Sequence, residues 1–352
     1  MDHGRGGGRK GRTVGVSLRN VGPILRSLAL SRTAVCRISL CWAVVGPFGA
    51  ASAQDLTPLV TQCASGGSPA LLTSCQSAVL AAQATRGGIA ITDAAGASLS
   101  GSWSTIGRRL GSTPRVSVDL RGRVARFSMP DLVGGGPGTA ADNDVYVYGI
   151  KGSVAVGVLD GFSLMPTVGG ILSLDLLVSA SLLFLGESDG FLGNEGLASV
   201  GGRIGIFRES FNLPGLTVSA MRSFGQQVNW ADDMNGTQID TDISTTSVRA
   251  IIGKDFFTLA VLAGFGWNWD HGEMRVQVPD PTIPGGQGVG LMGDLTTRRT
   301  VYFAGVSITR LVWTFSIEGG WIGGDDRLTG YPGVYDPGAI TPFISAAARL
   351  TI

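Results

Sequence analysis

The chain has 352 residues, of which 55 are glycine, 44% are hydrophobic and 15% are charged. This low charge argues against disorder and against a nucleic-acid-binding protein, which would carry a basic stripe. The formal net charge of +1 is unevenly distributed, because residues 1–53 hold eight arginines and lysines and a single acid, which leaves −6 for the remainder.

The first 53 residues have the layout of a secretory signal peptide. A long positive region is followed by an apolar stretch, Ile38–Ala50, and then by an A-x-A cleavage pattern at residues 51–53. The apolar stretch is too short to cross a membrane as a helix. We therefore expect export and cleavage after Ala53, rather than a membrane anchor. The unusual length of the positive region leaves a start codon downstream of Met1 as an alternative.

Two of the four cysteines lie beyond the expected cleavage point. Cys36 and Cys41 would leave with the signal peptide, whereas Cys63 and Cys75 would remain in an oxidising compartment. We predict a disulfide between Cys63 and Cys75. The sequence offers no metal site there, because no second cluster of cysteine and histidine accompanies the pair.

Residues 54–114 form a separate N-terminal segment. Apolar residues recur at helical spacing from Pro69 to Thr85, which predicts a short helix that ends at Gly87-Gly88. This segment would lie in the periplasm or plug a barrel. Gly96–Gly111 is either an extended linker or a first strand.

From Arg115 onward the hydrophobic pattern has a period of two. In 171–185, leucine, valine and phenylalanine alternate with serine and aspartate, and in 257–270 two tryptophans continue such a face. A strand with one apolar and one polar face is half buried. The predicted strands are longer than the usual five or six residues, which suits a tilted membrane strand.

The pattern predicts an all-β fold, a transmembrane antiparallel up-and-down barrel spanning 115–352. The ten expected strands are 115–128, 144–158, 168–186, 196–208, 215–228, 243–253, 256–270, 298–309, 312–322 and 341–352. Short connections alternate with long polar ones, such as 271–298, as in outer-membrane barrels. Twelve strands result if Leu99–Gly111 is a strand and the change of phase between Val124 and Phe127 is a turn.

A soluble β-sandwich would show similar alternation, so three further features decide for lipid. Aromatic residues gather at strand ends beside the long connections, at Tyr146, Tyr148, Trp267, Trp269 and Trp321. The polar faces are rich in glycine and serine, as a narrow lumen requires. Closure also removes the edges that long apolar strands would otherwise expose.

With these features, residues 115–352 resemble the bacterial outer-membrane β-barrel superfamily, in porin-like form. The resemblance implies an outer-membrane location, with outer-membrane lipid and the barrel-assembly machinery as partners. Barrels of this group commonly end on an aromatic residue. Here the last strand keeps its alternation but ends on Ile352.

The sequence gives no catalytic, metal or cofactor site. Barrel proteases of the omptin type use an aspartate and a histidine two residues apart on one strand face. Asp270 and His271 are adjacent, so in a regular strand they face opposite sides. No G-x-S-x-G motif is present. The acidic stretch 231–242 lacks the order of a calcium loop, and the glycine-rich stretches precede no phosphate-binding helix.

Several charged residues fall on predicted inward faces, because charges within the membrane span must face the lumen or a partner. These lumen-facing candidates are Lys151, Asp175, Arg203, Arg249, Asp270, Glu318 and Arg349. They would line a narrow pore for small hydrophilic solutes, or form paired charges that fill a closed barrel. The alternatives are a structural or adhesive barrel that binds partners through its outer loops and, third, a barrel hydrolase centred on His271.

Overall fold

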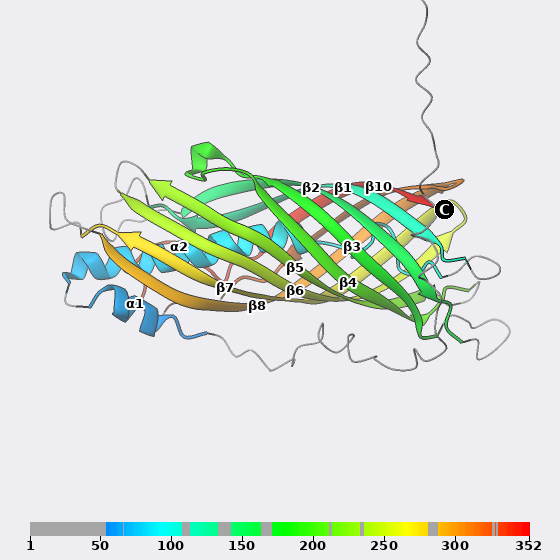
Figure 1. The fold of residues 1–352 in the computed structure, drawn as a ribbon, viewed down its shortest axis with the longest axis horizontal. Helices are drawn as coiled ribbons and strands as arrows, with labels where there is room; N and C mark the ends of the chain where they lie inside the picture. The colour runs from blue at the N-terminus through cyan, green and yellow to red at the C-terminus, as the bar shows by residue number, and fades with distance from the viewer. Residues whose placement is uncertain are drawn as a thin grey trace, which may run out of the picture. The chain divides into compact units, whose positions relative to one another are not determined.

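The computed structural model describes residues 54–352, apart from 66, 108–112, 133–141, 163–170, 211–212, 233–235, 281–287, 326–327 and 329. The expected signal peptide lies outside the described residues. Ten antiparallel strands pair in sequence order, and β1 pairs with β10 to close the barrel (Figure 1). The strands are β1 (Val116–Pro130), β2 (Asp142–Leu159), β3 (Ser173–Phe184), β4 (Glu195–Phe207), β5 (Gly215–Asp232), β6 (Thr237–Phe256), β7 (Leu259–Val278), β8 (Val289–Arg310), β9 (Trp313–Ile322) and β10 (Thr341–Thr351). The predicted ten-stranded fold is confirmed.

The two faces of the barrel wall differ as the alternation predicts. In β3, Ser173, Asp175 and Ser179 are buried toward the lumen, whereas Leu176 and Val178 are exposed on the outside. Exposed aromatic residues mark both ends of this apolar outer face, among them Tyr146, Tyr148, Trp321, Trp313, Phe315 and Phe256. Within lipid, a closed ladder pairs the backbone hydrogen-bonding groups of each strand with those of its neighbours, and an apolar outer face suits contact with lipid. The chain is therefore a transmembrane barrel of the outer-membrane type.

The two ends of the barrel are distinguished by their connections. Two-residue turns join β6 to β7 and β8 to β9 at one end, where the C-terminus also lies. The opposite end carries the longest connection, 323–340, although the connection 160–172 between β2 and β3 lies at the first end. Because outer-membrane barrels have short periplasmic turns and longer extracellular loops, we name these the inner end and the outer end.

The twelve-strand alternative is wrong. β1 runs without a turn from Val116 to Pro130 and pairs with β2 along its whole length. Val124 points outward and Phe127 points inward. Because both are apolar, the hydrophobic pattern changes face between them although the strand does not turn. Residues 99–107 lie inside the lumen and belong to no strand of the barrel.

Strands β6, β7 and β8 are longer than predicted, and most of the expected loop 271–298 is strand. Beyond Trp269 the outward residues of β7 become polar, so the apolar alternation that predicted the strand is lost. The inward residues Met274, Val276 and Leu291 stay apolar and pack in a buried cluster. The backbone ladder therefore continues past the membrane at the outer end.

Two α-helices precede the barrel, α1 (Thr57–Cys63) and α2 (Pro69–Ala94). A short 3-10 helix, η2 (Glu187–Asp189), follows β3. The expected end of α2 at Gly87-Gly88 is wrong, because the helix continues through both glycines. A side chain at Gly87 would overlap Arg299, and one at Gly88 would overlap Phe127. The glycines thus allow α2 to approach the barrel wall. Among the described residues, neither helix is long and apolar enough to cross a membrane.

Candidate functional site

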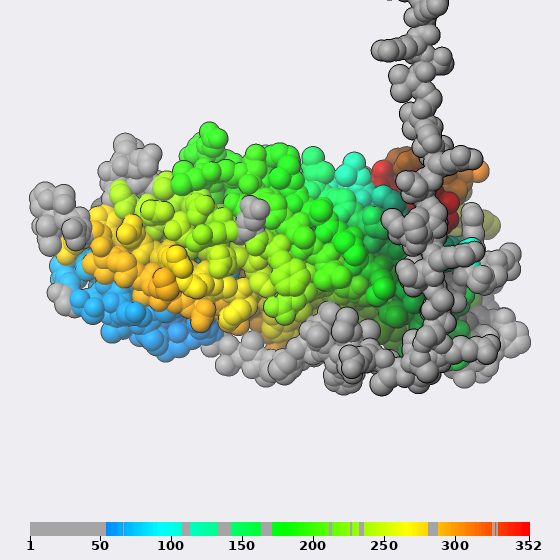
Figure 2. Space-filling view, viewed as in Figure 1, coloured from blue at the N-terminus to red at the C-terminus, as the bar shows by residue number. Residues whose placement is uncertain are grey.

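The N-terminal segment occupies the lumen of the barrel. Every residue of α2 from Ser77 to Asp93 is buried, which a helix achieves only when it is surrounded on all sides. The following residues, 95–107, belong to no helix or strand and make several bends, and they are mostly buried as well. We call α2 together with 95–107 the plug, and 95–107 its non-helical part. In Figure 2 the strands cover most of this segment, and its blue surface emerges beside β8 at the outer end. The chain thus enters the lumen at the outer end and leaves it at the inner end, where the amide of Arg115 donates to the carbonyl of Gly107.

Cationic side chains of the wall bind the C-terminal end of α2. Arg123 donates to the carbonyl of Thr92 at 2.9 Å, and Arg249 donates to that of Ala94 at 2.8 Å. The guanidinium of Arg121 reaches the carbonyl of Ala95 at 3.3 Å. The last carbonyls of a helix lack partners within the helix and carry partial negative charge. The wall therefore supplies the cap that α2 does not make for itself.

Asp93 is the anionic centre of the same region. Its buried carboxylate lies 3.0 Å from the Nζ atom of Lys151 on β2. The hydroxyls of Ser181 on β3 and Ser223 on β5 each donate to it at 2.5 Å. One side chain of the helix is thereby bound to three different strands, which fixes both the depth and the rotation of α2.

Wall carboxylates bind the non-helical part of the plug. Glu318 accepts from the amides of Ala97 and Gly101, both at 2.9 Å. Asp175 accepts from the amide of Ile106 at 3.0 Å and is paired with Arg203 at 2.7 Å. Backbone amides that would otherwise be buried without partners are therefore satisfied by charged acceptors, which make strong hydrogen bonds.

The seven lumen-facing candidates all point inward. Six are buried, and Arg349 is half-buried with its Nη1 atom 2.8 Å from the carbonyl of Ser100. Six of the seven contact the plug, although Asp175 and Arg203 also pair with each other, and Asp270 is bound by wall residues. Sequence reasoning missed Asp119, Arg121 and Arg123. They lie two residues apart on one face of β1, so the period-two pattern already placed them together.

Asp270 and His271 lie on opposite faces of β7. The Asp270 carboxylate is buried in the lumen, where Thr245 donates to it at 2.8 Å and Arg299 lies 3.8 Å away. His271 is exposed on the outside, with its Nδ1 atom 3.0 Å from the hydroxyl of Thr296. The two side chains therefore cannot act on one substrate. No group of metal-ligating residues occurs among the described residues.

Cys63 and Cys75 form a disulfide that joins α1 to α2 at the outer end. Replacing both by serine releases a short loop and should lower the local stability of α1 by roughly 3 kcal/mol. We expect the amides of α1 to exchange faster with deuterium, with the strands unchanged. Reduction of the wild-type protein should produce the same change. Equal exchange in the oxidised and reduced proteins would contradict this role.

The barrel wall has a gap in its outer half, because β9 and β10 are short. Pairing of β8 with β9 starts at Val301, and pairing of β1 with β10 ends at Ala125. The outer parts of β8, 289–300, and of β1, 126–130, therefore have a neighbouring strand on one side only. We call this region the wall gap.

Non-strand residues close the wall gap on its β8 side. The side-chain amide of Gln54 donates to the carbonyl of Asp294 at 2.7 Å and accepts from the amide of Thr296 at 2.6 Å, much as a paired strand would. Further along β8, Arg299 makes a two-point ion pair with Asp325 of the 323–340 connection. Together they cover the exposed edge that a missing strand leaves.

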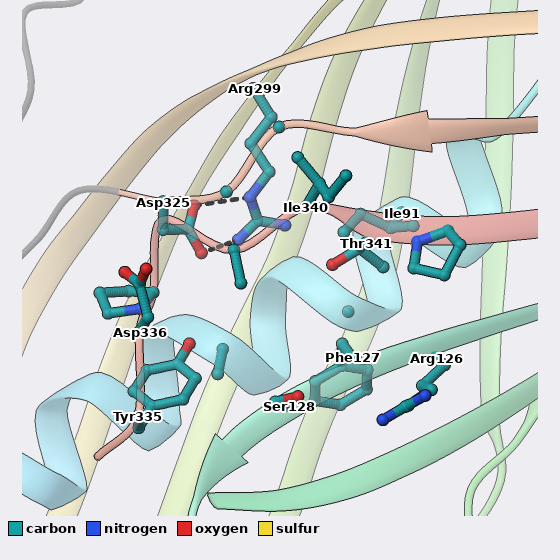
Figure 3. A pocket seen from close by; sticks show the side chains of 17 residues that line it. Ile91, Arg126, Phe127, Ser128, Arg299, Asp325, Tyr335, Asp336, Ile340 and Thr341 are labelled. Atoms are coloured by element: carbon teal, nitrogen blue, oxygen red, sulfur yellow. Dashed lines mark hydrogen bonds and ion pairs between the residues drawn. The ribbon is translucent and has the colours of Figure 1, made fainter. Parts of the chain in front are cut away.

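A pocket of about 250 Å³ remains in the wall gap beside β1. In Figure 3, α2 crosses it between the Arg299–Asp325 pair and Phe127 of β1. Tyr335 lines one side, and burial next to the Asp325 carboxylate raises the pKa of this phenol far above its usual range. It therefore stays a neutral hydrogen-bond donor. The pocket is lined by both apolar and polar groups, among them Phe127, Ile91, Arg126 and Asp336.

No family model and no curated protein matches this chain. Similar solved structures include the outer membrane protease OmpT from Escherichia coli, with 11% identity, 73% of this chain and 100% of that chain covered, and a TM-score of 0.36. Another is Ail, the attachment invasion locus protein of Yersinia pestis, with 9% identity, coverages of 68% and 99%, and a TM-score of 0.30. A third is the translocator domain of autotransporter NalP from Neisseria meningitidis, with 10% identity, coverages of 69% and 89%, and a TM-score of 0.33.

These proteins differ in function, so a shared barrel does not indicate what this chain does. Its fold and its place in the outer membrane follow from its own strand pairing and apolar outer face. The chain is an outer-membrane β-barrel whose lumen is filled by its own N-terminal segment.

Proposed function

We propose that the protein is a closed barrel that binds partners or ligands at its outer end, rather than an open pore. The observation that supports this proposal is the plug. Its helix and its non-helical part run through the lumen, and both are hydrogen-bonded to the wall. A pore needs a continuous water-filled path, whereas these contacts replace water with protein.

The outer end offers the structural means for binding. β5 to β8 extend beyond the apolar outer face and pack over a buried cluster that includes Trp230 and Met274. The disulfide that links the helices lies at the same end, and the wall gap adds a small pocket. A rigid surface of this kind loses little conformational entropy when a partner binds.

A narrow pore for small hydrophilic solutes is the second candidate. The inner wall supports it, because many of its positions are small and hydroxylated, for example Ser153, Ser179, Ser199, Ser219 and Ser316. Such a surface would hydrate readily if the plug moved. The lumen charges would then set the preference for ions.

We propose no enzymatic role. Hydrolysis centred on His271 would need an orienting acid and a nucleophile on the same face, and Asp270 is directed to the other side of the wall. If purified protein hydrolysed a substrate, His271→Ala should leave the rate unchanged.

Single-channel recording in a planar bilayer tests the proposal. We expect the full-length protein to insert and give no steady conductance. Folding is checked separately by the shift in gel mobility between unheated and boiled samples, and insertion by co-flotation with lipid vesicles. Steady openings of the full-length protein would overturn the closed barrel and favour the pore.

A further inference from the structure

The outer face of β5 to β8 changes from apolar to polar at a single row of residues. Arg222 of β5 pairs in register with Thr246 of β6, which pairs with Trp269 of β7, which pairs with Arg298 of β8. Alternation directs all four side chains outward. We call these residues the cationic row.

The cationic row lies where the hydrocarbon of the membrane ends. Toward the inner end the same face exposes Ile252, Val261, Phe265 and Tyr302. Toward the outer end, the next row begins with Phe224 on β5. Its other three members are polar: Ser244, His271 and Thr296. Lipid headgroups occupy this boundary, and aromatic belts mark it in membrane proteins.

The two arginines of the row have aromatic neighbours but no carboxylate partner within the described part of the chain. The Arg298 guanidinium lies 5.6 Å from the ring of Trp267 and 5.7 Å from that of Trp269. That of Arg222 lies 5.4 Å from the ring of Phe224, and its buried Nε atom has no hydrogen-bond partner there. The aromatic rings hold both cations against the wall.

Other outward arginines near the outer end do have acidic partners. Arg126 of β1 is paired with Asp144 of β2, and Arg275 of β7 lies 3.3 Å from Glu273. A charge that faces lipid needs a partner, because it is costly to leave unpaired at the membrane. For Arg222 and Arg298 the described residues supply no such anion, which leaves both cations available to an anion of the membrane surface.

We propose that the cationic row binds the phosphate groups of a lipid headgroup in the outer leaflet. Arginine matches phosphate oxygens with two parallel hydrogen bonds. Arg222 and Arg298 are three strands apart, about 14 Å at the usual strand spacing. A headgroup with two phosphates spans such a distance, and Thr246 and His271 lie between the arginines as further hydrogen-bonding groups.

The test measures lipid binding to the full-length protein in detergent by native mass spectrometry. The probes are diphosphoryl lipid A and phosphatidylcholine. We expect wild-type protein to retain lipid A in preference, and Arg222→Gln/Arg298→Gln to bind it at least about tenfold more weakly. Added salt should weaken the wild-type interaction.

Arg275→Gln is the matched control, because it removes an outward arginine of the same wall that already has an acidic partner. It should bind lipid A as wild type does. The heat-dependent gel shift verifies that each variant is folded, and bilayer conductance is an independent measurement that does not bear on this result. Equal binding by the double variant, or equal retention of phosphatidylcholine, would overturn the proposal. Displacement of lipid A by millimolar inorganic phosphate, where sodium chloride of the same ionic strength displaces none, would also overturn it, since the site would then prefer a soluble anion.

Discussion

Removing residues 54–107 should turn a silent barrel into a conducting one. The deletion takes away α1, α2 and the non-helical part of the plug. It leaves a lumen lined by hydroxyls and charges, several of them without their plug partners, and water will fill this lumen. We expect steady openings in a planar bilayer where the full-length protein gives none. The freed arginines on the wall, among them Arg121, Arg123 and Arg249, should make the pore prefer anions.

A shorter deletion serves as the internal control. A variant that lacks 54–94 keeps the non-helical part of the plug, which Glu318 and Asp175 bind near the inner end. Its conductance should lie between zero and that of the full deletion. A gel shift on heating verifies that each barrel is folded. If folded protein without 54–107 stays silent, something other than the plug closes the lumen.

The strand order and the inward charges follow from the sequence because both depend on local alternation. Period two fixes the side of the wall on which Lys151 or Glu318 lies, whatever the rest of the chain does. It does not fix the partner of that side chain. Lys151 binds Asp93, and Glu318 binds the amides of 97 and 101, more than 200 residues earlier. Such pairs depend on the threading of the plug, which no local pattern encodes.

Two errors of the sequence reading share one physical origin. Gly87 and Gly88 predict a helix end from propensity alone, but in the lumen they are the positions where Arg299 and Phe127 come closest to α2. The polar outward residues beyond Trp269 predict a loop, yet the inward residues of β7 and β8 continue a buried core. In both cases tertiary packing outweighs the local preference.

Asn in place of Asp93 should destabilise the plug more than any other single isosteric change that we consider. The substitution removes the negative charge next to Lys151 and Arg123 and leaves two buried cations at the end of α2. Breaking a buried ion pair by removing one partner costs about 3–5 kcal/mol. We expect a loss of this size in the free energy of unfolding in urea with lipid vesicles, and faster deuterium exchange in α2.

Asp144→Asn is the matched control, because Asp144 is also paired with an arginine, Arg126, but at the exposed surface. Water screens that pair, so its loss should leave the free energy of unfolding at the wild-type value. Adding Lys151→Met to Asp93→Asn should recover part of the lost stability, since it removes one of the uncompensated cations. If Asp93→Asn changes stability no more than Asp144→Asn, water must reach the end of α2. The lumen would then be open enough for ions, and the proposal of a closed barrel would be wrong.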